Sequence, residues 1–320
     1  MMLNKALVLG ATGGTGTAII AELLKRGVES VAFGRSMNKL EQLAGVLGNP
    51  TGLQLRTGDV FNSNDVYEAA QGVDVIFHSA SIPYHEMSTK LLPMGEAVMQ
   101  AANKRGVKVV AVDGIYPYGK RTDEQPIDEN YPKHPHTRKG KVKLEFERMF
   151  FSPHWNRVKG MIVRLPDYYG PTANEASYLG STLASIASGK PGMFIGNMTV
   201  PREYVYLPDA AVMMVELAGR EEAYGQSWNI PGAGVISGRD IVRIARKASG
   251  TSKAVLPVGA VGLSILGVFI PVMKEIVEML YLTKEPLRLS GRKYERLIGP
   301  IPSTPFEEGI TATIHSLMSR

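Results

Sequence analysis

Short apolar runs alternate with amphipathic stretches through the first 165 residues. Six runs are rich in β-branched or aromatic residues and are bounded by turn residues, which predicts strands at 6–9, 30–33, 53–55, 73–77, 107–112 and 161–165. After the first of them, Ile20, Leu23 and Leu24 recur at helical spacing before Gly27. Strands alternating with helices predict right-handed βαβ units, and hence an α/β fold with a doubly wound parallel sheet of the Rossmann type.

The pattern loosens after Leu165, where prolines and glycines punctuate the chain as far as Pro201. Later signals predict strands at 203–207 and 228–230 and helices at 210–218, 238–248 and 304–318. The last helix is predicted to open with the sequence Thr304-Pro305-Phe306-Glu307, a capping box with proline at the first helical position. These elements predict a smaller C-terminal lobe.

The composition narrows the class of protein. Of 320 residues, 44% are hydrophobic and 21% are charged, which is typical of globular proteins and excludes disordered and fibrous chains. The chain has no cysteine, so thiolate nucleophiles and cysteine-ligated metals are excluded. The net charge of +6 comes without long basic runs or interleaved aromatic residues. An anionic small ligand therefore fits better than nucleic acid.

Two segments bear on location. The apolar run near the N-terminus, at 6–9, is far too short for a signal peptide, which predicts a cytoplasmic protein. Residues 254–273 carry no charge and lie between Lys253 and Lys274, a length that could span a membrane. Prolines and glycines interrupt this stretch, however, so a short strand and turn followed by a buried helix are favoured over membrane contact.

A glycine-rich loop follows the first predicted strand and opens the first predicted helix. Its sequence is Gly10-Ala11-Thr12-Gly13-Gly14-Thr15-Gly16. Gly10 would allow the tight turn, Gly13 would let the backbone approach a pyrophosphate, and Gly16 would let the helix pack closely on the strand. The helix N-terminus then offers amide donors to phosphate oxygens. This context predicts a dinucleotide-binding site.

The end of the second predicted strand indicates which dinucleotide binds. An NAD site usually has a carboxylate there for the ribose 2′-hydroxyl, whereas this chain has Arg35 and Ser36. Because a guanidinium suits a 2′-phosphate, NADP(H) is preferred over NAD(H). We therefore expect an NADP(H)-binding domain at 1–166, which also receives 203–232, and a discontinuous substrate-binding lobe at 167–320.

The chain resembles the extended branch of the short-chain dehydrogenases/reductases, which includes nucleotide-sugar epimerases and dehydratases. Besides the glycine loop, the motifs that carry the resemblance are 58–60, 78–81, 118–119, 164–171, 202–210 and 228–232. The resemblance implies that Asp59 and Val60 contact adenine, that Ser79, Ala80 and Ser81 line the nicotinamide ribose, and that Pro166 approaches the nicotinamide. It also implies a homodimer formed through two helices, which a monomer in light scattering would refute.

The family's catalytic serine and Tyr-x-x-x-Lys pair are not kept together. Alignment on Tyr118-Gly119 places Gly114 at the serine position. Alignment of the helix at 136–145 keeps Lys143, which holds the ribose in the family, but places Lys139 where the tyrosine belongs. A literal Tyr-x-x-x-Lys at 116–120 contains Pro117 and Gly119, so it does not have helical spacing. The site is therefore atypical.

Several residues could replace the missing groups. Lys139 and Lys143 are four residues apart on a predicted helix, so the like charges could depress one pKa and make Lys139 a proton donor. A solvated lysine in a basic turn is favoured over this hypothesis. Asp113 ends the fifth strand and is either a general base or a turn cap. Tyr118 is a further catalytic candidate. Substrate contacts are expected from Tyr84, Tyr116 and Tyr168.

No metal site is expected, because His134 and His136 lack an evident third ligand. The sequence thus predicts an NADP(H)-dependent oxidoreductase that transfers hydride to or from a small organic substrate. Two alternatives stay open: a nucleotide-sugar epimerase or dehydratase, and a non-catalytic NADP(H)-binding sensor or regulatory protein.

Overall fold

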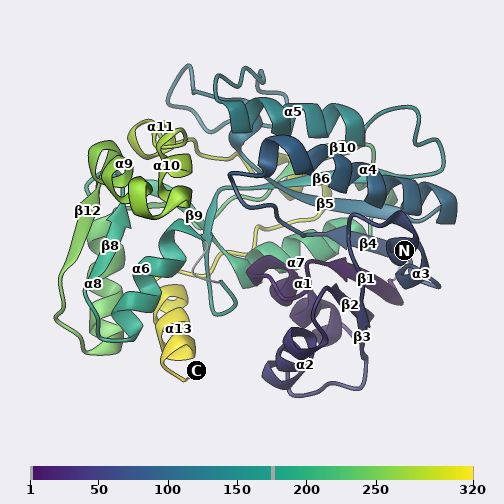
Figure 1. Ribbon diagram of the computed structural model, residues 1–320, viewed down its shortest axis with the longest axis horizontal. Helices are drawn as coiled ribbons and strands as arrows, with labels where there is room; N and C mark the ends of the chain where they lie inside the picture. Colours follow the sequence, from purple (N-terminus) through teal and green to yellow (C-terminus); the bar gives the residue numbers. More distant parts are fainter. Residues whose placement is uncertain (1–2, 174–176, 320) are drawn as a thin grey trace.

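A seven-stranded parallel sheet forms the centre of the protein (Figure 1). The computed structural model describes residues 3–173 and 177–319. The strand order is β3-β2-β1-β4-β5-β6-β10, and each neighbouring pair is parallel. The strands are β1 (Lys5–Leu9), β2 (Glu29–Gly34), β3 (Leu53–Thr57), β4 (Val75–His78), β5 (Lys108–Gly114), β6 (Gly160–Leu165) and β10 (Gln226–Asn229). The predicted Rossmann-type α/β fold is confirmed.

Helices cover both faces of this sheet. One face carries α1 (Gly14–Lys25), α2 (Met37–Val46) and α7 (Leu207–Ala218), and the other carries α3 (Ser63–Ala69), α4 (Met87–Arg105) and α5 (Arg138–Phe150). Along β1, Val8 packs on the first face, whereas Leu7 and Leu9 pack on the second. Because the central strands are buried on both faces, they read as continuous apolar runs in the sequence.

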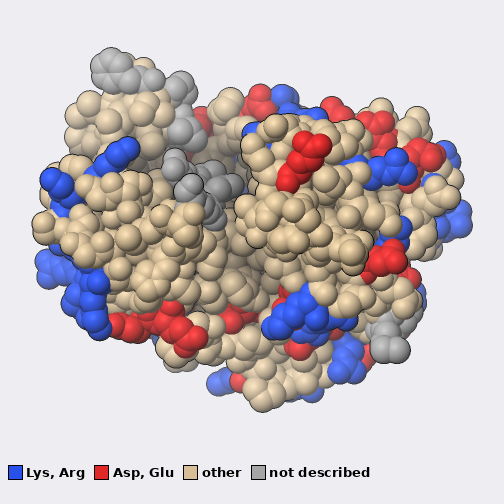
Figure 2. All heavy atoms as spheres, turned by 90° about the horizontal axis from the view of Figure 1, so that it is seen from below, with Lys and Arg blue, Asp and Glu red and all other residues tan. Residues whose placement is uncertain are grey.

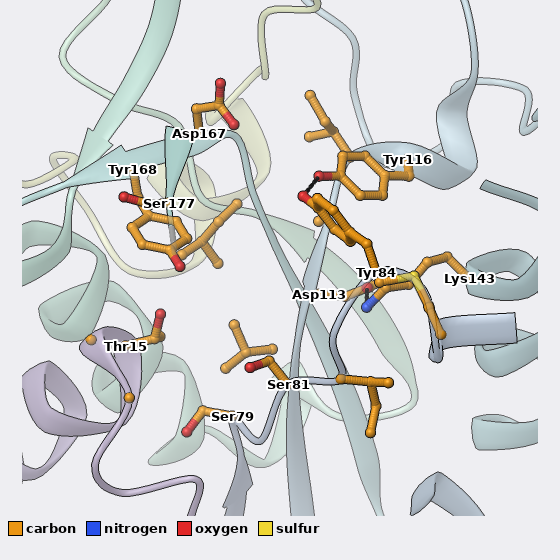
Figure 3. A pocket seen from close by; sticks show the side chains of 18 of the residues that line it. Thr15, Ser79, Ser81, Tyr84, Asp113, Tyr116, Lys143, Asp167, Tyr168 and Ser177 are labelled. Atoms are coloured by element: carbon orange, nitrogen blue, oxygen red, sulfur yellow. Dashed lines mark hydrogen bonds and ion pairs between the residues drawn. The ribbon is translucent and has the colours of Figure 1, made fainter. Parts of the chain in front are cut away.

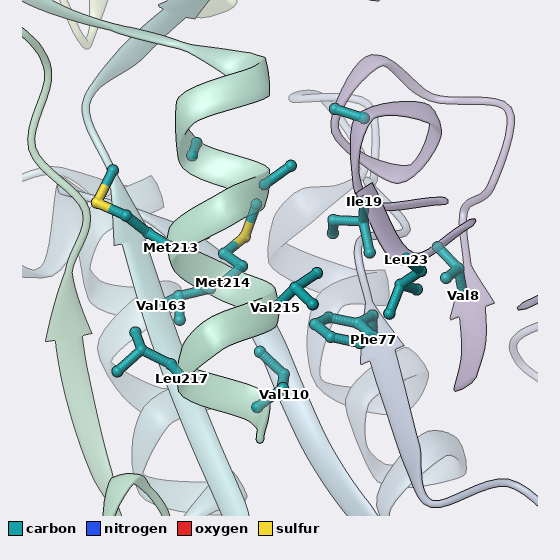
Figure 4. Packing of buried hydrophobic residues seen from close by; sticks show 14 of the residues in the cluster. Val8, Ile19, Leu23, Phe77, Val110, Val163, Met213, Met214, Val215 and Leu217 are labelled. Atoms are coloured by element: carbon teal, nitrogen blue, oxygen red, sulfur yellow. The ribbon is translucent and has the colours of Figure 1, made fainter. Parts of the chain in front are cut away.

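Figure 4 shows the first of these cores. Met214 and Val215 of α7 point toward Ile19 and Leu23 of α1, above Phe77 and other strand residues. Burial of large apolar side chains such as these stabilises the fold by about 1.5–3 kcal/mol each. The packing fixes α1, and with it the loop that precedes it, against the carboxyl end of β1.

Two small sheets lie outside the central one. Strand β9 (Arg202–Tyr206) lies between β7 (Asp167–Tyr169) and β11 (Val235–Ile236), and β8 (Gly192–Ile195) pairs with β12 (Val255–Val258). The other helices are α6 (Tyr178–Ala187), α8 (Gly238–Ser249), α9 (Ala260–Phe269), α10 (Pro271–Val277), α11 (Tyr281–Lys284), α12 (Arg292–Leu297) and α13 (Phe306–Met318), with short 3₁₀ turns at Tyr116–Tyr118 and Glu221–Ala223.

Two local predictions are wrong. The capping box does not form, because Pro305 lies at the N-cap of α13 and Thr304 instead bonds both carboxylate oxygens of Asp209, at 2.7 and 2.8 Å. The uncharged stretch at 254–273 does begin with a short strand, β12, but the helix that follows is not buried. Of its side chains Val261, Ile265 and Val268 are exposed.

Candidate cofactor and substrate cavity

The glycine loop has the geometry that its sequence predicts. Gly10 adopts a φ of +77°, and a Cβ there would lie 2.6 Å from the backbone of Ala80. A Cβ on Gly16 would lie 2.3 Å from the carbonyl oxygen of Gly10. Gly13 is the N-cap of α1 with no side chain to occupy the helix end, so the first amide groups of the helix face a ligand unobstructed. This cradle fits a dinucleotide pyrophosphate.

The adenosine end of the predicted site is open. Arg35 is exposed directly after β2, and its side chain makes none of the ion pairs found within residues 3–173 and 177–319. Ser36 has a structural role, because its Oγ accepts the Lys39 amide and caps α2. The Asp59 carboxylate accepts the Phe61 amide at 3.0 Å, and Val60 packs on the core beneath it.

A cavity of about 250 Å³ lies at the carboxyl ends of β1, β4, β5 and β6 (Figure 3). This is the edge at which ligands bind in doubly wound sheets. The structure brings together here the predicted residues Gly13, Gly14, Thr15, Ser79, Ala80, Ser81, Tyr84, Asp113, Tyr116, Lys143, Pro166 and Tyr168. Thr12, within the glycine loop, is exposed. Ser79 is oriented by its Oγ, which donates to the Leu9 carbonyl at 2.7 Å.

Lys143 reaches the cavity from α5, which packs on the sheet face that also carries α3 and α4. Its Nζ lies 2.6 Å from Oδ1 of Asp113, whose other oxygen pairs with Arg164 at 2.7 Å. Burial alone would raise the pKa of the Asp113 carboxyl, but Lys143 and Arg164 outweigh it and hold that pKa below its usual value. A carboxylate held this way is a weak base at neutral pH, so the geometry fits Asp113 better as a positioning partner of Lys143.

Two tyrosine hydroxyls meet on the cavity wall that lies across from the glycine loop. Oη of Tyr84, from the segment after β4, lies 2.6 Å from Oη of Tyr116, from the turn after β5. Figure 3 shows this pair facing the space above Ser81 and Lys143. Burial raises the pKa of both hydroxyls, that of Tyr116 to well above its usual value. Both therefore stay protonated across the ordinary pH range.

Sequence reasoning missed two residues of this wall. Asp167 and Tyr178 line the cavity beside Tyr168, which the sequence did predict. Burial raises the pKa of Asp167, against the opposing effect of Arg202 at 3.9 Å. The Tyr178 ring packs on Tyr84 with their centroids 6.4 Å apart. Asp167 lies within the motif at 164–171 but was assigned no role there. No motif marks Tyr178, because α6 approaches the cavity only through the tertiary fold.

Lys139 and Tyr118 lie outside the cavity lining. Lys139 is fully buried, and its Nζ contacts Glu275 of α10 at 2.6 Å and Glu278, the C-cap of that helix, at 2.8 Å. Tyr118 is also fully buried and donates to Oδ1 of Asn229 at 2.8 Å. Neither side chain is free to reach a ligand in the cavity. This geometry favours structural roles over the proton-donor hypothesis for Lys139 and the catalytic hypothesis for Tyr118. The interpretation of Lys139 as a solvated lysine is wrong, because its side chain is fully buried.

The histidine that ends β4 lies behind the site. His78 is buried against the Phe146 ring, at 6.3 Å between centroids, and its Nδ1 has no hydrogen-bond partner among the described residues. Burial, aided by the charge on Lys143, lowers the pKa of His78 to about 4. His78 is therefore neutral at physiological pH, and it adds no positive charge near Lys143.

Comparison with known proteins now identifies the family. The model of the NAD dependent epimerase/dehydratase family matches residues 6–230. The chain belongs to this family. The match spans β1, the glycine loop, the cavity residues and β10, so the resemblance seen in the motifs is confirmed.

Similar proteins are named as nucleotide-sugar enzymes. UDP-glucose 4-epimerase of Rickettsia conorii is 30% identical over 135 residues, which cover 37% of this chain and 39% of the relative's own length. A UDP-glucuronic acid 4-epimerase from Bacillus cereus, solved with NAD, has a TM-score of 0.79 at 20% identity, covering 98% of this chain and 99% of its own. A dTDP-glucose 4,6-dehydratase from Streptomyces venezuelae, solved with NAD, has a TM-score of 0.78 at 20% identity, covering 98% and 96%.

Proposed function

We propose that this protein is an NADP(H)-dependent oxidoreductase that reduces a small organic carbonyl compound in the cavity. The observation that carries the proposal is the meeting of two structures at one cavity. The glycine loop lines one side of it, and the hydroxyl pair of Tyr84 and Tyr116 lines the other. The glycine loop suits a dinucleotide, and the hydroxyl pair suits the oxygen of a carbonyl compound.

The proposed preference for NADP(H) rests on Arg35. Its exposed guanidinium follows β2, where a carboxylate would repel a 2′-phosphate. The loop from Gly10 to Gly16 would hold the pyrophosphate, Asp59 and Val60 the adenine, and Ser79, Ala80, Ser81 and Lys143 the nicotinamide ribose, with Pro166 beside the nicotinamide. Bound there in its reduced form, the cofactor would supply a hydride to the substrate carbon.

The tyrosine pair would supply the proton. A carbonyl oxygen that gains negative charge during reduction needs a hydrogen-bond donor, and a protonated hydroxyl is one. One hydroxyl proton lies between Tyr84 and Tyr116, and in this proposal the other is given to the substrate oxygen. We assign the donation to Tyr116, with Tyr84 orienting its hydroxyl.

The protonation state of Tyr116 is compatible with reduction. Burial raises the pKa of Tyr116 well above its usual value, so its hydroxyl enters the reaction protonated. Asp113 is held below its usual pKa by two cations. The cavity thus contains a protonated donor, and of its lining carboxylates Asp113 has a lowered pKa and Asp167 a raised one.

The test is turnover of NADPH with a panel of small ketones, aldehydes, quinones and enones, followed by loss of the reduced nicotinamide absorbance. We expect at least one ketone or quinone to be reduced, with the hydride carried from deuterated cofactor to the product carbon. Tight binding of NADPH with no turnover of any compound would contradict the proposal and favour the sensor alternative.

A second candidate is supported by the family match. The relatives named above are 4-epimerases and a 4,6-dehydratase, so the same panel should include UDP-glucose and dTDP-glucose. Epimerisation in the family uses a catalytic tyrosine as base, and this chain has Lys139 at that position, paired with Glu275 and Glu278. Conversion of UDP-glucose to UDP-galactose without net consumption of cofactor would establish this candidate.

A further inference from the structure

Helix α9 is apolar on the side that faces away from the protein. Val261, Ile265 and Val268 lie at helical spacing on one face and are 76, 61 and 77% exposed, and Ile270 at the helix end is 45% exposed. We call these four side chains the α9 patch. An ordinary surface helix has polar residues on its outer face, and a helix that is apolar all round is normally buried. Something therefore covers this face.

The exposure does not come from poor packing of the helix. Leu263, on the opposite face, is 1% exposed and packs with Ile195, Ile276 and Leu280. Helices α9 and α10 lie together at one end of the C-terminal lobe, beside β12 (Figure 1). A helix fixed from within presents the α9 patch as a stable outer surface.

The charges around the patch are basic. No acidic or basic residue occurs between Lys253 and Lys274, and both lysines are exposed without an ion pair among the described residues. The first acidic residues that follow are Glu275 and Glu278, and both are paired with the buried Lys139. Lys274 lies beside α9, since its Cβ is 2.9 Å from where a Cβ on Gly267 would lie, whereas Lys253 precedes β12. The unpaired charges that flank the patch in the sequence are therefore positive.

We propose that the α9 patch docks this protein on an anionic lipid surface. None of the helices in residues 3–173 and 177–319 is long and apolar enough to cross a membrane, so α9 would lie in the plane of the interface. Its four side chains would enter the headgroup boundary while Lys253 and Lys274 contact acidic headgroups.

A second copy of the chain fits the patch less well. A stable protein–protein interface needs about 800 Å² from each partner, contributed by 20–30 residues, whereas the patch has four apolar side chains. Two copies packed on this face would also bring their lysines together. A lipid surface accepts a small apolar projection and attracts the flanking cations.

Docking would place the cavity beside the lipid. Tyr84 and Tyr178, which line the cavity, also pack against the cluster that holds α9 and α10. The lipid-facing helix thus lies one layer of side chains behind the cavity wall. Vesicle binding itself requires neither cofactor nor turnover, so its failure would leave the proposed oxidoreductase function untouched.

The test is cosedimentation of the full chain with vesicles made of equal parts phosphatidylcholine and phosphatidylglycerol, with pure phosphatidylcholine vesicles as comparison. Val261→Glu is the test variant. Val46→Glu is the matched control, because Val46 is 75% exposed on α2, far from the patch in sequence and in a different part of the fold. A third variant replaces Lys253 and Lys274 by Gln.

We expect the wild-type protein and Val46→Glu to bind the mixed vesicles equally. Val261→Glu should bind about tenfold more weakly or not at all. The lysine variant should lose less vesicle binding than Val261→Glu, and high salt should weaken binding of the wild-type protein to a similar extent. Equal vesicle binding by Val261→Glu and Val46→Glu, or no binding by the wild type, would overturn the proposal. So would dimerisation without lipid that Val261→Glu alone abolishes, since the patch would then serve a second copy.

Discussion

The two sides of the cavity are built in different ways. The glycine-loop side is made of main chain from one continuous segment, between β1 and α1, and its shape depends on absent side chains. The opposite side is made of the tyrosines 84, 116, 168 and 178, which come from four separate segments. Backbone recognition suits an invariant pyrophosphate, and side-chain recognition suits a substrate that differs between relatives. The difference explains why one side obeys the family pattern and the other departs from it.

Charge is arranged differently on the two sides as well. Arg35 stands exposed at the adenosine end without an ion pair in the described ranges. The cations behind the tyrosine side, Lys143 and Arg164, are both paired with Asp113, and Arg164 is also paired with Glu147. On the face shown in Figure 2, basic and acidic side chains are interspersed around the rim and do not form a basic stripe. The unpaired positive charge of Arg35 thus lies where the 2′-phosphate of NADP(H) is proposed to bind.

The largest expected effect is on the main-chain side. Gly16→Ala places a Cβ 2.3 Å from the Gly10 carbonyl oxygen, which is main chain and cannot move aside without deforming the loop. NADPH affinity, measured by nucleotide fluorescence, should fall by about 100-fold or more. Gly45→Ala is the control, because a Cβ there meets nothing within 4 Å. A folded Gly16→Ala variant with wild-type affinity would show that the loop is not the cofactor cradle.

The second largest expected effect is on the tyrosine side of the cavity, where a substitution should change catalysis and leave cofactor binding intact. Tyr116→Phe removes the proposed proton donor, so kcat for carbonyl reduction should fall by about 100-fold while NADPH affinity stays unchanged. Tyr118→Phe is the matched control, because its hydroxyl bonds Asn229 outside the cavity. That control should lose about 1 kcal/mol of stability and keep its kcat. An unchanged kcat in Tyr116→Phe would remove this tyrosine from the chemistry.

Lys139 gives a third test, because it occupies the family's tyrosine position in a structural role. Lys139→Met leaves Glu275 and Glu278 without their buried partner, which should lower the free energy of unfolding by about 2–3 kcal/mol in urea denaturation. NADPH affinity should not change. Lys141→Met, at an exposed position of the same helix, should be neutral. Loss of turnover at unchanged stability would instead restore the proton-donor hypothesis.

The pH dependence of stability tests the histidine behind the site. Since the pKa of His78 is about 4 in the folded protein and about 6.5 in the unfolded chain, the unfolded chain binds the proton first as pH falls. Between pH 7 and pH 5 this one group should lower the free energy of unfolding by about 2 kcal/mol. His78→Asn should remove that part of the pH dependence, and the exposed-site control His154→Asn should not. Identical profiles for all three proteins would contradict the burial of His78 as a neutral group.

The features of the fold and site that follow from local sequence patterns could be predicted, and those that depend on contacts between distant residues could not. The parallel sheet and the glycine loop follow from local signals, namely apolar runs such as 6–9 and the spacing from Gly10 to Gly16. The partners of Lys139 could not be predicted, because Glu275 and Glu278 lie more than a hundred residues away and no periodicity links them to α5. Tyr178 was missed for the same reason, whereas Asp167 lies within the motif at 164–171 and was assigned no role. The capping sequence at Thr304 was misread because Asp209, a tertiary partner, competes for its hydroxyl.

Titration with NADPH and NADH separately, followed by nucleotide fluorescence, tests the central claim most directly. The proposed cofactor is NADP(H), with its 2′-phosphate bound by Arg35. The wild-type protein should therefore bind NADPH at least about tenfold more tightly than NADH. Arg35→Glu should reverse that preference, while Arg148→Glu, at an exposed position of α5, should leave it intact. Equal affinity for the two cofactors in the wild type, or equal losses in both variants, would contradict the 2′-phosphate assignment. Binding of neither cofactor would contradict the whole account of the cavity.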